Sequence, residues 1–89
     1  MKLTSKGRIA VTSLVYIDIN SQGQKPVSLS EISVRQNISL PFLEQIFLLL
    51  KNNGIVKSVR GPTGGYIFAK NPHHVKVYDV IQAIDEELK

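Results

Sequence analysis

The sequence predicts a mainly α-helical domain with one small two-stranded β-hairpin, in the order α-α-α-β-β-α. Apolar residues recur at helical spacing in four separate segments. A serine placed three residues before a glutamate marks the start of the second segment. A loop rich in glycine and proline separates two short runs of β-forming residues ahead of the fourth.

Length and composition limit the classes of protein that the chain can be. Its 89 residues predict one domain, residues 1–89, which buries about 60–65% of its unfolded surface. The absence of cysteine excludes disulfides and thiolate ligands or nucleophiles within this chain, and it suits a reducing cytoplasm. No apolar run reaches the roughly 20 residues of a membrane span, and "MKLTSKGR" lacks the apolar core of a signal peptide. We therefore expect a cytoplasmic protein without a membrane segment.

The charge is basic and uneven along the chain. Residues 1–60 contain eight basic and three acidic residues, whereas residues 61–89 contain three basic and four acidic residues. A net charge of +4 that is concentrated in the first two thirds favours an anionic partner, and nucleic acid is the first candidate. The alternative is a basic protein without such a partner.

The first helix is predicted over residues 4–19. Its apolar residues form a broad stripe: Ala10, Val11, Leu14, Val15 and Ile17. Thr4 or Ser5 can cap this helix. Lys6 and Arg8 lie in the first turn, where the helix dipole disfavours cations. That placement is either neutral surface or a helix start that faces phosphate.

A short second helix is predicted over residues 29–36, after the polar loop 20–26. Ser28 and Glu31 form the S-x-x-E pattern of a capping box. Asn37 is suited to the left-handed conformation that ends a helix.

The third helix is predicted over residues 39–53. Ser39 caps it, Pro41 occupies its first turn, where a missing N–H costs little, and Gly54 ends it. Its inward residues repeat at helical spacing: Leu43, Ile46, Phe47 and Leu50. A short helix joined to a longer one by about three residues is the helix-turn-helix pattern.

A hairpin of residues 55–60 and 66–70 follows, with its loop in the stretch "VRGPTGGY", residues 59–66. After the break at residues 71–72, a last amphipathic helix is indicated by Val77, Val80, Ile81, Ile84 and Leu88. Three helices, a hairpin and a helix together predict a winged helix-turn-helix domain.

The glycine loop does not match a nucleotide site. A P-loop requires Lys-Ser or Lys-Thr and then a helix, whereas Gly65 precedes a strand. As a hairpin tip, Gly64 and Gly65 permit positive φ and Pro62 fixes its own φ. Such a narrow tip fits a DNA minor groove about 6 Å wide, with Arg60 at its base. A plain β-turn with a solvated arginine is the alternative.

The outward face of the third helix has the chemistry for base contacts. It presents Pro41, Glu44, Gln45, Leu48 and Lys51. Gln45 can pair with an adenine edge, and Glu44 can accept from a cytosine amino group. The alternative for Glu44 is an ordinary solvent-facing glutamate. "IFLLLK" has more apolar residues than one face can bury, so Leu48 or Leu49 is exposed, or packs on a partner or on the first helix.

Other residue clusters are weak candidates for chemistry. His73 and His74 are neighbours without a third metal ligand nearby, and residues 85–87 resemble a solvated helix end. No Ser/His/Asp set has a recognisable signature. We therefore expect neither an enzyme nor a protein with a small-molecule substrate or a cofactor.

Three stretches resemble the IscR-like family of bacterial winged helix-turn-helix transcription regulators. They are "LTSKGRIAVTSLVYI", "ISLPFLEQIF" and "VRGPTGGYIFAK", and the resemblance covers essentially the whole chain. It implies dimers that bind near-palindromic operators, base contacts from Glu44 and Gln45, and an Arg60 that enters the minor groove. It also implies backbone contacts at or beside four positions: Ser5, Lys6, Ser39 and Lys51. Pro41, Gly61 and Thr63 complete the predicted DNA-binding set.

The chain departs from this family in three respects. The family's sensors carry three cysteines and a histidine beyond the last helix, which hold a [2Fe–2S] cluster, whereas this chain ends earlier and has no cysteine. The long dimerisation helix is also missing. Pro41 stands in place of a small hydroxyl residue, and Leu48-Leu49 replaces more polar residues. We therefore expect no cluster in this chain.

The sequence thus predicts a sequence-specific transcription regulator that binds double-stranded DNA. Residues 39–53 would enter the major groove and residues 59–66 the minor groove. The alternative is a protein-interaction module, or a truncated partner that forms heterodimers with a longer relative. A homodimer is a further possibility.

Overall fold

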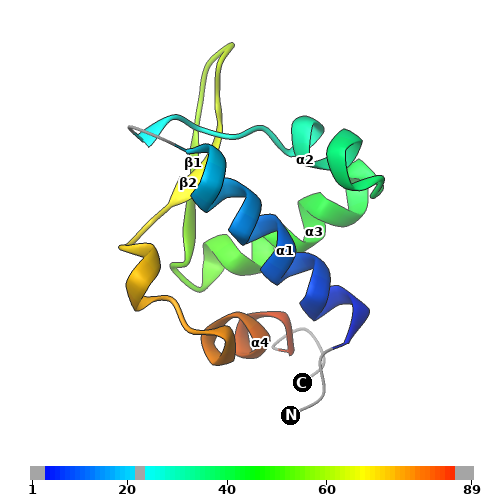
Figure 1. Ribbon diagram of the computed structural model, residues 1–89, viewed down its shortest axis with the longest axis vertical. Coiled ribbons are helices and arrows are strands. Elements are labelled where there is room, and N and C mark those ends of the chain that lie inside the picture. The colour runs from blue at the N-terminus through cyan, green and yellow to red at the C-terminus, as the bar shows by residue number, and fades with distance from the viewer. Residues whose placement is uncertain (1–3, 22–23, 86–89) are drawn as a thin grey trace.

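Four α-helices and one β-hairpin make up the part of the chain that the computed structural model describes, residues 4–21 and 24–85 (Figure 1). Their order confirms the predicted winged helix-turn-helix arrangement. The elements are α1 (Ser5–Asn20), α2 (Leu29–Gln36), α3 (Leu40–Asn52), β1 (Val56–Val59), β2 (Gly65–Phe68) and α4 (Val77–Asp85). A single 3-10 turn, Pro72–His74, separates the hairpin from α4.

The helices begin where the sequence places hydroxyl caps. The Thr4 Oγ1 accepts from the Gly7 N–H at 3.0 Å, the Ser28 Oγ from Glu31 at 3.1 Å, and the Ser39 Oγ from Phe42 at 3.2 Å. Each bond satisfies one of the donors that a helix leaves unpaired at its start. Asn37 ends α2 with a φ of 55°, as predicted. The capping box is formed only in part, because the Glu31 carboxylate accepts from the Tyr16 hydroxyl of α1.

The core lies between α1, α3 and α4, and the hairpin covers one end of it. The predicted inward residues of α3 are all fully buried: Leu43, Ile46, Phe47 and Leu50. The rings of Phe47 and Tyr66 contact each other with centroids 5.0 Å apart and planes tilted by 54°. This contact joins the centre of α3 to β2 and fixes where the hairpin leaves the helices.

The hairpin is antiparallel and shorter than predicted, with Val56 opposite Phe68 and Val59 opposite Gly65. A residue that the sequence placed outside the hairpin extends the pairing. The Val27 N–H donates to the Tyr66 carbonyl at 3.0 Å, and the Tyr66 N–H donates to the Val27 carbonyl at 2.8 Å. The segment before α2 is therefore tied to the base of the wing.

The glycines of the loop match the prediction in part. Gly65 has the predicted positive φ, +159°, whereas the other positive φ of the loop, +120°, lies at Gly61 and not at Gly64. A Cβ at Gly64 would lie 2.2 Å from the Val59 carbonyl oxygen, and one at Gly65 would lie 2.3 Å from the Val27 carbonyl oxygen. Gly64 is therefore needed because other backbone approaches it, and Gly65 for this reason as well as for its φ; the close approach depends on neighbours that the local pattern does not reveal.

Two residues of the predicted apolar stripes are exposed. Val15 in α1 is 50% exposed and Val77 at the start of α4 is 52% exposed. Val15 is rotated by about 100° from Leu14, which takes it off the buried stripe. Leu88 lies outside the described residues. Among those residues, no helix has both the length and the apolar character needed to cross a bilayer.

Candidate nucleic-acid interface

The outward face of α3 is exposed as the sequence predicted. The five residues of this stripe are all accessible: Pro41, Glu44, Gln45, Leu48 and Lys51. They repeat at intervals of three and four residues, opposite the buried stripe of the same helix. A carboxylate, an amide and an ammonium group therefore lie along one side of α3, with polar atoms available to an outside partner.

Ser39 stands at the beginning of this face. Its Oγ accepts from the Phe42 N–H, which occupies a lone pair and leaves the hydroxyl proton available for a second bond. The helix α3 begins at Leu40, directly after Ser39. The backbone N–H groups of its first turn point out of this end of the helix. This end of α3 suits an anion such as a phosphate.

The wing ends in a tight turn. The Gly64 N–H donates to the Gly61 carbonyl at 3.0 Å and closes the tip. Arg60, Gly61 and Thr63 are all exposed. In Figure 1 this loop projects beyond the helices at the top of the view. Its only long side chain is that of Arg60, at the base of the tip.

The predicted contact segments spread along the molecule instead of converging on one pocket. The wing tip is at the top of Figure 1, α2 and the beginning of α3 are at the upper right, and the first turn of α1, with Ser5 and Lys6, is at the lower right. The molecule measures 36 × 28 × 20 Å. An extended partner suits this distribution better than a small ligand, because contacts to a duplex are distributed along its backbone.

The leucine pair of α3 is divided between surface and core. Leu48 is 55% exposed, whereas Leu49 is half-buried and packs against the core cluster. Within this chain, Leu48 is therefore the exposed one of the pair. It adds an apolar contact surface beside Gln45 and Lys51 on the outward face.

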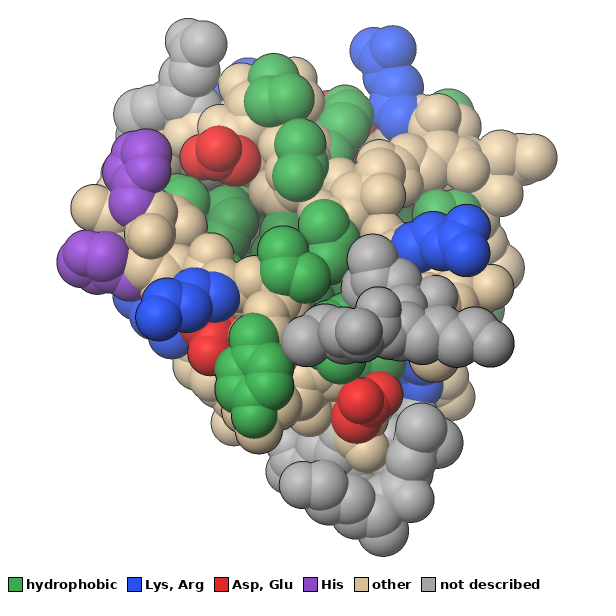
Figure 2. All heavy atoms as spheres, turned by 60° about the horizontal axis from the view of Figure 1, so that its bottom comes forward, with side chains coloured by type: hydrophobic (Ala, Val, Ile, Leu, Met, Phe, Trp, Pro, Cys, Tyr) green, Lys and Arg blue, Asp and Glu red, His purple; other side chains and the backbone are tan. Residues whose placement is uncertain are grey.

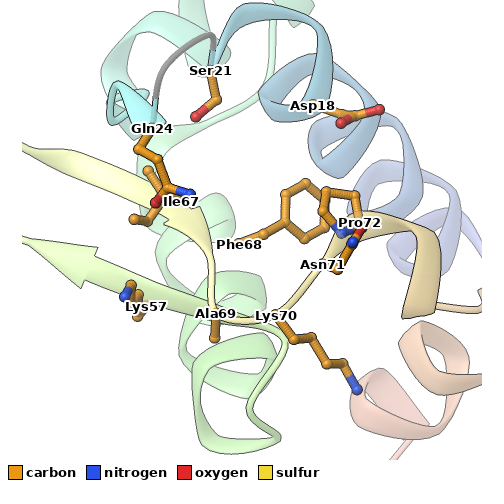
Figure 3. A pocket seen from close by; sticks show the side chains of 10 residues that line it. All are labelled: Asp18, Ser21, Gln24, Lys57, Ile67, Phe68, Ala69, Lys70, Asn71 and Pro72. Atoms are coloured by element: carbon orange, nitrogen blue, oxygen red, sulfur yellow. The ribbon is translucent and has the colours of Figure 1, made fainter.

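A separate recess of about 550 Å³ lies beside the hairpin. Its lining comes from the end of α1, the loop after it, the two strands and the turn before α4. In Figure 3 Phe68 and Pro72 occupy the middle, with Asp18 on one side and Lys57 and Lys70 on the other. The recess has no lining residue from α3, so it is distinct from the outward face of that helix.

An apolar surface lies on yet another side of the molecule. Figure 2 shows hydrophobic side chains gathered on the face that α4 presents together with the neighbouring side of α1. A groove of about 170 Å³ crosses it, lined by residues that include Val11, Val15 and Val77. Tyr78 of α4 is also largely exposed. Exposed apolar patches of this kind are typical of surfaces that contact other proteins.

The fold, the exposed helix face and the projecting wing define a winged helix-turn-helix domain of the kind found in DNA-binding regulators. Residues 3–89 match the profile of Rrf2, described as an iron-dependent transcriptional regulator family. The chain belongs to this family.

Relatives and solved structures support this assignment. The chain is 52% identical over 88 residues to the HTH-type transcriptional regulator IscR of Pectobacterium atrosepticum, and 51% identical to IscR of Escherichia coli O1:K1 / APEC. These matches cover 99% of this chain but 53% and 54% of the relatives, so it spans about half their length.

Two solved structures have the same fold. The structure of T. potens IscR superposes with a TM-score of 0.84 at 42% identity, covering 100% of this chain and 64% of the other. That of CymR, the global cysteine regulator of B. subtilis, gives a TM-score of 0.87 at 34% identity, covering 96% of this chain and 65% of the other. The matched relatives are named as regulators, which confirms the predictions of an IscR-like regulator and of a protein that is not an enzyme.

The residues of this chain do not fit an iron–sulfur cluster bound through thiolates, because the 89 residues include no cysteine. In the described ranges, no group of three or more His, Cys, Asp or Glu side chains has the arrangement of a metal site. His73 and His74 are exposed neighbours in the 3-10 turn.

Proposed function

We propose that this chain binds duplex DNA in a sequence-specific manner and regulates transcription, with residues 39–53 in the major groove and residues 59–66 in the minor groove. The observation that supports this most strongly is the exposed polar stripe of α3, which starts at a capped helix end. A recognition helix reads base edges mainly from its N-terminal half, where Glu44 and Gln45 lie. In this function the chain acts without an iron–sulfur cluster of its own, and in a bacterium it works in the cytoplasm, where the DNA is.

Base selection is assigned to Glu44 and Gln45. The Gln45 amide both donates and accepts, which matches the N6 and N7 atoms of adenine. The Glu44 carboxylate only accepts, which suits the N4 amino group of cytosine, and phosphates repel it. Glu44 therefore contributes more to the choice of base than to affinity.

Affinity is assigned to cationic and small polar groups around this helix. Arg60 enters the minor groove, where the potential is most negative when the groove is narrow. The bare backbone of Gly61 and the small side chain of Thr63 allow the tip to approach the groove floor. Ser5, Lys6, Ser39 and Lys51 contact phosphates, and Pro41 lies at the helix start against the sugar-phosphate backbone.

The test begins with selection from duplexes randomised over about 20 base pairs, enough for two half-sites one helical turn apart. Anisotropy titrations of the selected duplex between about 50 and 200 mM salt should give log K falling by about 0.9 for each phosphate contacted. Arg60→Ala should weaken binding about tenfold and reduce the salt slope by roughly 1. Glu44→Ala should change affinity less but relax the preference at one base pair.

Lys70→Ala is the matched control for charge, because Lys70 is exposed and lines the recess away from α3. It should change the affinity by less than about twofold, because Lys70 belongs neither to α3 nor to the tip of the wing. If no duplex is enriched, or if Lys70→Ala and Arg60→Ala weaken binding equally, the proposed interface is wrong.

A second proposed role, favoured by the apolar surface of α1 and α4, is association with another protein chain. The partner is a second copy or a longer relative, which would also bring two α3 helices to one palindromic operator. Val15 and Val77 are about half exposed on this surface, and burial of such side chains stabilises a contact.

Sedimentation over a range of concentrations tests this role. The chain should change from monomer to dimer alone, or form a mixed dimer with a longer relative, and Val15→Asp with Val77→Asp should abolish this. Val34→Asp is the control, since Val34 is an exposed valine on α2. Monomers throughout, with or without the longer relative, would eliminate the role.

A further inference from the structure

The helix α2 is held in place by few apolar contacts. It has eight residues, and Ile32 is the one that is fully buried. Val34 is 80% exposed. Its packing is chiefly against α3, and its backbone meets α3 through the left-handed turn at Asn37. Leu29 adds a partly buried contact with the core, and polar contacts supplement this limited apolar packing in setting the orientation of α2.

One such contact comes from α1. The Tyr16 hydroxyl donates a hydrogen bond to the Glu31 carboxylate, which joins the two helices across 15 residues of sequence. The backbone N–H of Glu31 is held by the Ser28 cap at 3.1 Å. The Tyr16 ring packs against the core cluster. The Tyr16 ring and the Glu31 backbone are therefore both held in place. The hydrogen bond between the two side chains then sets the distance between α1 and α2.

The surroundings of the Tyr16 hydroxyl raise its pKa. The hydrogen bond to Glu31, then burial, then the negative charge of Glu31 raise the pKa of Tyr16 above its ordinary value of 10.0. Arg35, one turn further along α2, acts in the opposite direction. A phenol with the ordinary pKa is already protonated at neutral pH, and the raised pKa extends the pH range over which Tyr16 donates to the carboxylate.

Two hydrogen bonds connect the end of α2 to the residue before the cap of α3. The Ile38 N–H donates to the Ser33 carbonyl at 3.1 Å, and the Ser33 hydroxyl donates to the Ile38 carbonyl. These two bonds close the turn between the helices. A shift of α2 therefore displaces Ser39, the cap of α3, and the helix start beyond it.

We propose that Tyr16 is a positioning residue for DNA binding, which acts by holding α2, and through it the start of α3, at one orientation on α1. The inference rests on the proposed function of α3 as the recognition helix. Without the bond, α2 samples several orientations, and only a fraction of the molecules presents α3 correctly. The apparent dissociation constant rises by the inverse of that fraction.

Tyr16→Phe removes the hydroxyl and keeps the ring. We expect the dissociation constant for the selected duplex to rise about three- to tenfold at temperatures where the variant is fully folded. The matched control is Ser21→Ala, which removes the hydroxyl that donates to the Lys25 carbonyl at 2.7 Å beside the recess, outside both proposed contact surfaces. It should leave DNA affinity unchanged. A hydroxyl with a merely structural role would lower the melting temperature without altering the affinity of the folded protein.

Changes at Glu31 separate this bond from other effects. Glu31→Gln retains an acceptor oxygen and should retain most of the affinity, whereas Glu31→Ala should lower it. Tyr16→Phe should then have no further effect in the Glu31→Ala background, as a double-mutant cycle requires. Additive losses in the two single variants would overturn the inference.

Amide hydrogen exchange of the free protein tests the same idea without DNA. Tyr16→Phe should speed exchange in α2 and leave α4 unchanged. Unchanged exchange in α2 would overturn the inference even if the unmodified protein binds no duplex. If the unmodified protein binds and Tyr16→Phe binds equally well, the positioning role fails and the proposed function stands.

Discussion

Phe47→Ala is expected to remove a large part of the stability of the domain, about 3–5 kcal/mol. A chain of this length has a total free energy of unfolding of roughly 5–13 kcal/mol. Phe47 is 0% exposed and is the largest fully buried side chain of the described residues. Its removal leaves a cavity between α3 and the hairpin and deletes the contact with the Tyr66 ring.

Chemical denaturation monitored by circular dichroism measures this loss. The neighbouring residue supplies the control, because Leu48 belongs to the same helix but is mostly exposed. Leu48→Ala should change the free energy of unfolding by less than about 0.5 kcal/mol. Similar losses in the two variants would mean that α3 presents a different face to the core.

A milder change at the same position tests how the wing is held. Phe47→Leu keeps an apolar side chain in the core but removes the tilted ring contact that joins α3 to β2. The fold should persist, with a cost below that of alanine. If the ring contact sets the wing, Phe47→Leu should alter the chemical shifts of residues 60–65 more than those of α4.

Gly65→Ala is expected to cost about 2–4 kcal/mol and to detach the wing from the segment before α2. A Cβ there would lie 2.3 Å from the carbonyl oxygen and 2.4 Å from the carbonyl carbon of Val27, and 2.8 Å from the nitrogen of Ser28. Backbone atoms cannot move aside as a flexible side chain can. The chain must therefore give up the two hydrogen bonds between Val27 and Tyr66.

Gly54→Ala is the matched control for this glycine. Gly54 has a φ of +73°, but a Cβ would meet nothing within 4 Å. It should cost about 1–2 kcal/mol from backbone strain alone. Thermal unfolding should show Gly65→Ala to be the less stable variant, with faster amide exchange at Tyr66. An equal melting temperature for both variants would contradict the close approach of Val27.

The candidate interface was predictable where it depends on one element. The periodicity of α3 separated Leu43, Ile46 and Phe47 from Glu44 and Gln45, and the structure exposes the second group. The caps at Ser28 and Ser39 were likewise readable, because a cap is a contact across three residues. The base contacts of Glu44 and Gln45 stay a prediction.

The parts that could not be predicted join residues distant in sequence. Nothing local indicates that Val27 pairs with Tyr66, or that the carbonyls of Val59 and Val27 approach Gly64 and Gly65 so closely. The sequence pattern assigned Glu31 to its own helix cap, whereas the fold directs its carboxylate to Tyr16.

The amino-acid sequence alone determined the order of the elements, the caps that start α1, α2 and α3, the buried face of α3 and the exposed tip of the wing. These follow from contacts within about one helical turn or one hairpin, which spacing and residue type encode directly. Only the tertiary structure decided which of Leu48 and Leu49 reaches solvent, how α2 is tied to α1, and which segment pairs with the base of the wing. Those choices depend on which surfaces meet when the elements pack, and packing is a property of the whole chain.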